Sequence, residues 1–127
     1  MRFRPEQHLR RQSDIRAVRE QGRRVECRAF TVWWKRREAP TVPVATEGPR
    51  VCVVASTSAV GHAVRRNRAK RRLREVFRQH QHLVPAGCDL MLIARAAATD
   101  RPLPELAQKF AEACAQIPRA PAPAKSP

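Results

Sequence analysis

Three features that would place this sequence in a common class of protein are missing. No apolar run approaches the roughly 20 residues that a membrane-spanning helix requires. Residues 1–5 are not followed by an apolar stretch, so we expect no secretory signal. The four cysteines (Cys27, Cys52, Cys88 and Cys114) form no Cys-x-x-Cys pair, which argues against a zinc site. We therefore expect a cytoplasmic protein that does not span a membrane, whose cysteines are buried, reduced thiols.

Acidic residues are also scarce, with 11 against 26 lysines and arginines, and they are scattered singly along the chain. A protein-only nuclease would need clustered carboxylates to hold magnesium. Asp89 precedes an apolar run and is expected to serve a turn or a cap. His80 and His82 form a His-x-His pair, but two ligands are too few for a metal site. We expect no catalytic and no metal-ligating residues in the chain itself.

What the sequence does contain is positive charge. The formal net charge of the 127 residues is +15, and the pI is near 11.6. An excess of this size repels itself and normally requires a polyanionic partner. Nucleic acid is the first candidate and an anionic membrane surface is the second.

The charge is densest in residues 64–74, which hold seven cations in eleven residues and no acid. Apolar residues recur through and beyond this run at helical intervals. They are Ala69, Leu73, Val76 and Phe77. At about 100° per residue, this spacing predicts an amphipathic helix that docks through one stripe and presents a basic surface on the other side. The opposite side carries Asn67, Lys70, Arg71, Arg74 and Arg78.

The remaining elements follow from periodicity and from turn residues. A short helix capped by Ser13 or Asp14 is predicted to end before Gly22. We predict strands at 24–28, 29–36, 50–57 and 89–95, the basic helix at 62–79 and a last helix at 104–117. The fold class is therefore α+β, an α/β sandwich in the order α-β-β-β-α-β-α. The segment 50–95 forms a βαβ unit whose crossover helix is the basic one.

The predicted organisation is a single α/β domain at residues 12–117, with a basic arm at 1–11 before it. Residues 38–49, with three prolines and a glycine, are predicted to form a long loop. The proline-rich residues 118–127 are predicted to be a disordered tail.

The centre of the basic helix resembles a known signature. Arg66-Asn67-Arg68 stands within Gly-x-Ala-Val-x-Arg-Asn-Arg-x-Lys-Arg-x-x-Arg-x-x-Phe, which is similar to the pattern of the bacterial ribonuclease P protein component. Residues 14–18, 28–30 and 89–95 resemble the first helix, the first long strand and the strand after the signature helix of that family. The resemblance covers roughly residues 8–117.

This resemblance implies a fold with a left-handed βαβ crossover, against the right-handed rule for such units. It implies an RNA-binding subunit of an endoribonuclease, the ribonuclease P holoenzyme, which removes the 5′ leader of precursor tRNA. The catalytic centre would lie in ribonuclease P RNA, and Mg2+ would be held mainly by the RNA and the substrate. One protein per RNA is expected.

The resemblance also assigns residues. Its RNA-contacting helix corresponds to Arg66, Asn67, Arg68, Lys70, Arg71 and Arg74. Arginine suits this role because its planar guanidinium binds phosphate through two parallel hydrogen bonds. Arg65 and Arg72 lie toward the flanks of the apolar stripe and are expected only to solvate the helix.

A second surface of the family holds the single-stranded leader in a cleft between the sheet and the first helix. The candidates for it are Ile15, Arg19, Phe30 and Trp33. Trp33 and Trp34 point to opposite faces of their strand, and Phe30 belongs either to the core or to the cleft. The chain departs from the family at Ile15 and Arg19, where phenylalanines are usual. It also departs at Ser58 and Ala59, where lysines are usual.

Other basic proteins would share part of this pattern, including a ribosomal-type RNA binder and a DNA-binding protein. Strand aromatics beside a helix mounted on a sheet, together with the signature run, favour RNA. A membrane-surface role is disfavoured because the apolar stripe of the basic helix is narrow and lacks an aromatic border.

Binding of this protein to ribonuclease P RNA should weaken steeply with salt, because neutralising several phosphates releases condensed counterions. The measurement is the dissociation constant across a salt titration. An affinity that stays flat between low and moderate salt would contradict the assignment of the basic helix.

Overall fold

The structure, a computed structural model, describes Leu9 and residues 12–36, 49–85 and 87–117. The predicted arm apart from Leu9, most of the predicted loop at 38–49 and the predicted tail at 118–127 lie outside the described residues. The division of the chain into arm, single domain and tail therefore stays a prediction.

The elements follow one another in the predicted order, with one additional short α-helix, α2, and two 3-10 turns, η3 and η4. They are α1 (Gln12–Gln21), β1 (Arg23–Cys27), β2 (Phe30–Arg36), β3 (Arg50–Val54), α2 (Thr57–Val60), α3 (Ala63–His80), the 3-10 turn η3 (Gln81–Leu83), β4 (Cys88–Ala94), the 3-10 turn η4 (Ala96–Thr99) and α4 (Leu103–Ala115). The mixed α+β fold is thus confirmed.

Two local predictions were wrong. The third strand was predicted to reach residue 57, but it ends at Val54, and the short helix α2 follows. Its cap explains the early end, because the Ser56 hydroxyl accepts a hydrogen bond from the Ala59 backbone N–H at 3.1 Å. Ser13 and Asp14 do not precede α1, which begins at Gln12 and holds both in its first turn.

The four strands form one sheet in the order β1-β2-β4-β3. The pairs β1–β2 and β2–β4 are antiparallel, and β3 runs parallel to β4 with α2 and α3 between them in the chain. β4 is almost wholly buried, as its continuous apolar run predicted. The hand of the crossover, which the resemblance implies to be left-handed, stays a prediction.

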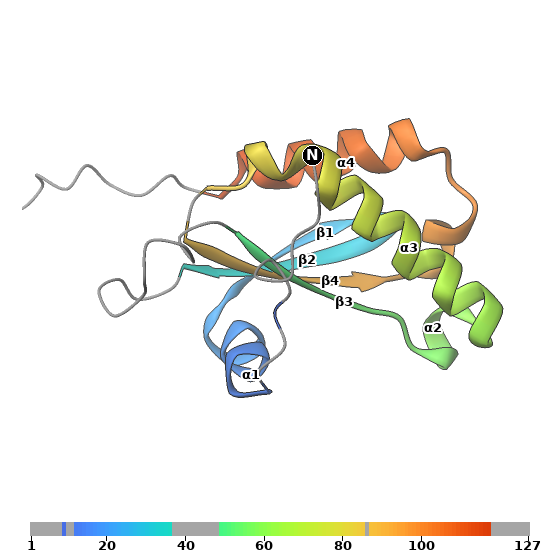
Figure 1. Ribbon diagram of the computed structural model, residues 1–127, viewed down its shortest axis with the longest axis horizontal. Helices are drawn as coiled ribbons and strands as arrows, with labels where there is room; N and C mark the ends of the chain where they lie inside the picture. The colour runs from blue at the N-terminus through green and yellow to red at the C-terminus, as the bar shows by residue number, and fades with distance from the viewer. Residues whose placement is uncertain (1–8, 10–11, 37–48, 86, 118–127) are drawn as a thin grey trace, which may run out of the picture.

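The sheet lies between α1 on one face and α3 with α4 on the other (Figure 1). The larger core fills the space under α3 and α4. Phe77 of α3 and Phe110 of α4 meet there edge to face, with ring centroids 6.5 Å apart. The predicted stripe of α3, formed by Ala69, Leu73, Val76 and Phe77, is buried in this core.

A smaller apolar cluster lies under α1. Leu9, Val18 and Met91 are buried in it, and Ile15 and Trp33 pack against them while remaining partly exposed. Leu9 is tied to the edge of the sheet because its N–H donates to the Val51 carbonyl at 2.9 Å. This cluster fixes the position of α1 over the strands.

Asp89 does not serve a turn or a cap, contrary to the prediction. It is 5% exposed and accepts two hydrogen bonds from Arg50 of β3, at 2.9 and 2.8 Å. The Arg50 guanidinium also lies 3.6 Å from Asp14 of α1. Its hydrogen bond to Asp89 raises the pKa of Arg50. One arginine therefore joins β3, β4 and α1, because a carboxylate this buried requires a charged partner.

Gly22, directly after α1, lies tightly against the backbone of β2. A Cβ atom at this position would lie 2.4 Å from the Val18 carbonyl oxygen and 2.5 Å from the Trp34 carbonyl oxygen. Both contacts are with backbone, which cannot rotate away as a flexible side chain would.

Gly22→Ala should lower the free energy of unfolding by about 2–3 kcal/mol, the usual cost of overpacking against rigid atoms. Urea denaturation followed by circular dichroism measures it. Gly87→Ala is the control, because Gly87 has a φ of 79° but nothing within 4 Å of a Cβ, so only the left-handed backbone costs about 1 kcal/mol. Equal losses in the two variants would contradict the close approach.

Candidate nucleic-acid interface

The outward side of α3 carries most of the residues that the sequence assigned to RNA binding. Asn67, Arg68, Arg71 and Arg74 are exposed, whereas Arg66 and Lys70 are partly buried. The helix places them by its period, since the buried stripe turns the intervening positions toward solvent. The charges consequently stand on a rigid element at fixed spacings.

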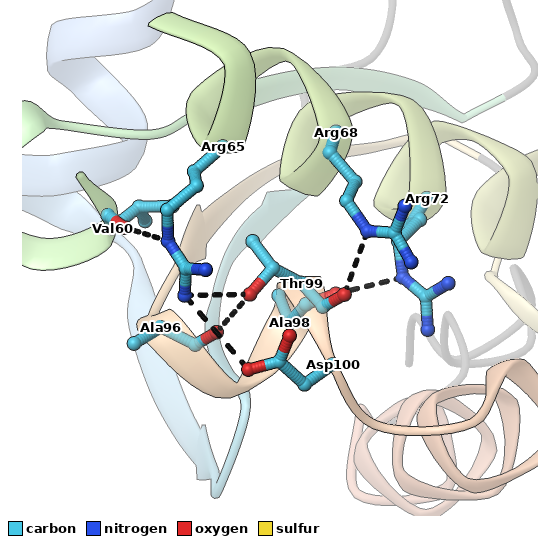
Figure 2. Close-up of polar contacts among 8 residues, drawn as sticks. All are labelled: Val60, Arg65, Arg68, Arg72, Ala96, Ala98, Thr99 and Asp100. Carbon is cyan, nitrogen blue, oxygen red and sulfur yellow. Dashed lines mark hydrogen bonds and ion pairs between the residues drawn. The ribbon is translucent and has the colours of Figure 1, made fainter. Parts of the chain in front are cut away.

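One flank of α3, formed by Arg65, Arg68 and Arg72, lies against η4. We call it the η4 flank. Arg68 Nε donates to the Thr99 carbonyl at 2.9 Å, and Arg72 Nε donates to the Ala98 carbonyl at 2.9 Å (Figure 2). These arginines donate hydrogen bonds to carbonyl groups of the connection between β4 and α4. They therefore stabilise the fold and also add positive charge to the surface.

Arg65 and Arg72 were expected only to solvate the helix, but both bind protein groups. Arg65 Nε donates to the Val60 carbonyl at 3.0 Å, and its Nη2 donates to the Thr99 hydroxyl at 3.0 Å. Arg72 Nη2 also donates to the Arg101 carbonyl. The angular positions of Arg65 and Arg72 on the helix predicted correctly that both lie on the flank. Angular position does not indicate which other part of the protein packs against that flank.

Arg66 lies on the other flank, near the buried stripe. Its Nε is buried and has no hydrogen-bond partner among the described residues. The Arg66 side chain therefore extends from the core, where its Nε is buried, toward the surface. Arg66 is therefore placed differently from Arg68, although the two belong to the same three-residue motif.

Lys70 and Arg74, on the same flank as Arg66, lie near the edge of the sheet. Burial raises the pKa of the Cys52 thiol on β3, and the positive charges of Lys70 and Arg74 oppose this rise. Cys52 belongs to the apolar cluster under α1. The basic flank of α3 therefore lies within electrostatic reach of the edge strand β3.

The face of the sheet that carries α1 presents the ring of Trp33 among positive charges. Trp33 is partly buried, and the guanidinium carbons of Arg19 and Arg24 lie 5.3 and 5.7 Å from its ring centroid. Both distances fit cation–π contacts. Ile15 packs on the same cluster from α1. Three of the four candidates for the leader cleft are therefore brought together by the fold.

Phe30, the fourth candidate, does not belong to this group. It is fully buried in the larger core, on the opposite face of the sheet from Trp33. Alternation along β2 separates the two side chains, because residues an odd number apart point to opposite faces. Phe30 is a core residue and cannot stack on a base.

Sequence reasoning missed Arg24, which pairs with Trp33 across the β1–β2 hairpin. The signal was available, since two strands joined by a tight turn set residues 24 and 33 opposite each other once the register is known. It also missed Arg50, whose partner Asp89 is 39 residues away in the sequence.

Among the described residues, no group of three or more histidine, cysteine, aspartate or glutamate side chains is placed to hold a metal ion. The four cysteines are free, and Cys52 is only partly buried, unlike the other three. Burial raises the pKa of the Cys27 thiol to about 11. No helix within the described ranges is long and apolar enough to cross a membrane.

Comparison with known proteins gives one consistent result. The model of the family described as Ribonuclease P matches residues 3–118. The chain is 42% identical over 98 residues to the ribonuclease P protein component of Symbiobacterium thermophilum, which covers 77% of this chain and 79% of that protein. It is 45% identical over 74 residues to the ribonuclease P protein component of Stutzerimonas stutzeri, a match that spans 58% of this chain and 56% of that relative.

The fold has a solved counterpart. The RNase P protein from Thermotoga maritima superposes with a TM-score of 0.72 over 87% of this chain and 97% of that one, at 23% sequence identity. At this identity the likeness establishes the fold and nothing further.

Replacing Arg72 with alanine should lower the free energy of unfolding by about 1–2 kcal/mol, because the Ala98 and Arg101 carbonyls lose their donor. Arg71→Ala, on the exposed side of the same helix, is the matched control and should change it by less than about 0.5 kcal/mol. Urea denaturation of both variants makes the comparison. Similar small effects in the two would show that the η4 flank contributes nothing to stability.

Proposed function

This chain belongs to the bacterial ribonuclease P protein family, the protein subunits of the RNA-based enzyme that processes the 5′ ends of tRNA, and we propose that it binds that RNA through α3 and the 5′ leader of precursor tRNA through the face around Trp33. The observation that carries the first half is the exposed basic side of α3. Asn67, Arg71 and Arg74 stand there on a helix whose other side is locked in the core.

A helix fixed in this way suits a folded RNA. Its charges do not have to be ordered when the RNA binds, so less conformational entropy is lost than with a disordered basic tail. Arginine predominates on the surface, and its guanidinium matches the geometry of phosphate oxygens. Arg66, Arg68 and Lys70 complete the surface at its two flanks.

The second half rests on the ring of Trp33. Single-stranded nucleic acid is bound without sequence preference when bases stack on aromatic side chains and nearby cations bind the backbone. Arg19 and Arg24 beside the ring supply two guanidiniums, which stack on bases or bind phosphates. The ability of these arginines to stack and to bind phosphate takes the place of the phenylalanines and lysines that the resemblance leads one to expect.

We expect the leader on the Trp33 face to come near the basic flank of α3. Lys70 and Arg74 act electrostatically on Cys52, which belongs to the same apolar cluster as Trp33. A leader strand leaving the Trp33 face in this direction therefore passes the basic flank of α3. One RNA-bound protein is thus able to contact both its RNA subunit and the substrate.

We assign the chemistry of cleavage to the RNA, with magnesium ions held by the RNA and the substrate and with one protein per RNA. Two acids of the described residues, Asp14 and Asp89, are both bound to Arg50. Asp14 and Asp89 approach each other only through Arg50, whose guanidinium supplies the positive charge that a metal ion would bring. We place the holoenzyme in the cytoplasm.

The test is cleavage of a 5′-extended precursor tRNA by the protein alone, by ribonuclease P RNA alone, and by both together at low magnesium. Efficient cutting at the mature 5′ end by the combination alone is the expected result. If the protein adds nothing yet binds RNA, it is a basic RNA-binding module of another kind. Cutting by the protein alone would show that the active site lies in the protein.

Trp33→Ala should weaken binding of precursor tRNA to the holoenzyme by about tenfold, the typical effect of losing one stacked base. Binding of mature tRNA, which has no leader, should not change. Trp33→Phe is the matched control and should retain most of the affinity, because it keeps an aromatic face. An equal loss of affinity for both tRNAs would contradict a contact with the leader.

A further inference from the structure

We propose that η4 is a positioning element for RNA binding: its carbonyl groups fix the inner edge of the Arg68 guanidinium, so that the outer edge faces an RNA phosphate. This inference rests on the proposed function of α3. It assigns a role to a connection that does not itself carry the basic signature.

The guanidinium of Arg68 is divided between two tasks. Its Nε donates to the Thr99 carbonyl at 2.9 Å, yet the side chain as a whole is exposed. Within the described part of the chain, its two terminal amino groups have no partner. These two groups are the donors that form parallel hydrogen bonds to phosphate oxygens. One edge is therefore fixed and the other is available.

The Thr99 carbonyl is itself held in place. The Thr99 side chain is 1% exposed, and its hydroxyl donates to the Ala96 carbonyl at 2.7 Å. The same hydroxyl accepts a hydrogen bond from Arg65 Nη2 at 3.0 Å (Figure 2). Arg65 in turn donates to the Val60 carbonyl of α2 at 3.0 Å and lies 3.8 Å from Asp100. The buried hydroxyl of Thr99 thus joins η4 to α3, out of reach of any RNA.

Arg72 supports the other side of the same segment. It donates to the Ala98 carbonyl, which precedes Thr99, and to the Arg101 carbonyl, which follows it. η4 is consequently attached to α3 on both sides of the Thr99 carbonyl. Arg65 and Arg72 use their donors inside the protein, so in this arrangement they are positioning residues and Arg68 is the one that contacts RNA.

The consequence for binding is preorganisation. A long exposed arginine loses rotational freedom when it binds a phosphate, and this loss weakens the complex. Arg71, on the exposed side of the same helix, has no hydrogen bond or ion pair to the described residues and must be ordered by the RNA. Arg68 is ordered beforehand by η4, so its contribution depends on the exact place of one carbonyl group.

The experiment is a double-mutant cycle on affinity for ribonuclease P RNA, with Thr99→Val in the wild-type and the Arg68→Ala background. Valine keeps the volume of threonine and removes only the buried hydroxyl. Thr31→Val is the matched control, because Thr31 is also buried but lies in β2, on the sheet rather than beside α3. Circular dichroism and urea denaturation establish that each variant is folded under the conditions of binding.

Thr99→Val should weaken RNA binding by about fivefold, less than the tenfold typical of losing a whole charged contact, whereas Thr31→Val should leave the affinity unchanged. In the Arg68→Ala background, Thr99→Val should have no further effect. An unchanged affinity of Thr99→Val would overturn the proposal. So would an equal loss in both backgrounds, because the hydroxyl would then act through something other than Arg68.

Lysine substitutions give a second, independent test. Arg68→Lys keeps the charge but cannot donate to the Thr99 carbonyl and to a phosphate along two edges, so it should bind RNA nearly as weakly as Arg68→Ala. Arg71→Lys should lose several-fold less affinity than Arg68→Lys, because Arg71 has no hydrogen bond to a carbonyl of the described residues to lose. An equal effect of the lysine substitution on RNA affinity at positions 68 and 71 would overturn the proposal. A wild-type protein that fails to bind the RNA at all would instead overturn the proposed function itself.

Discussion

The burial of one apolar stripe on α3 is the contact on which the rest of this structure depends. Leu73, Val76 and Phe77 are buried on the larger core, and each such side chain contributes about 1.5–3 kcal/mol. Repulsion between neighbouring exposed cations on a helix amounts to only a few tenths of a kcal/mol per pair. Burial therefore outweighs repulsion, and the chain is able to hold a dense array of positive charge on an ordered helix.

The second constraint is the shortage of acids in a chain with a net charge of +15. Backbone carbonyls take the place of carboxylates on the η4 flank, where Arg65, Arg68 and Arg72 all donate to them. The best-buried carboxylate, Asp89, is used for the bond to Arg50 that joins two parallel strands. Internal hydrogen bonding thus fixes some of the arginines and leaves others free, and this division gives the surface its different parts.

Much of the fold could be predicted because the relevant signals are local. The helical spacing of Ala69 and Leu73, the apolar run of β4 and the β-branched and aromatic residues of β2 each determine an element from a few neighbouring residues. Predictions of where an element ends, or of which distant residue a side chain binds, were less accurate. The third strand was drawn too long because the Ser56 cap of α2 competes with it, and Asp89 was assigned a local role because its partner is far away in the sequence.

The sequence by itself determined the family, the order of the elements and the side of α3 that is buried, because each depends on residue type and on short-range period. Only the tertiary structure decided what lies beside each flank of that helix. Angle on a helix gives the distance of a side chain from the stripe, but η4 and the edge of the sheet reach α3 from other parts of the chain. Alternation along β2 puts Phe30 and Trp33 on opposite faces of the sheet. Only the tertiary structure decided that the face of Phe30 lies under α3 and α4, and that of Trp33 under α1 beside Arg19 and Arg24.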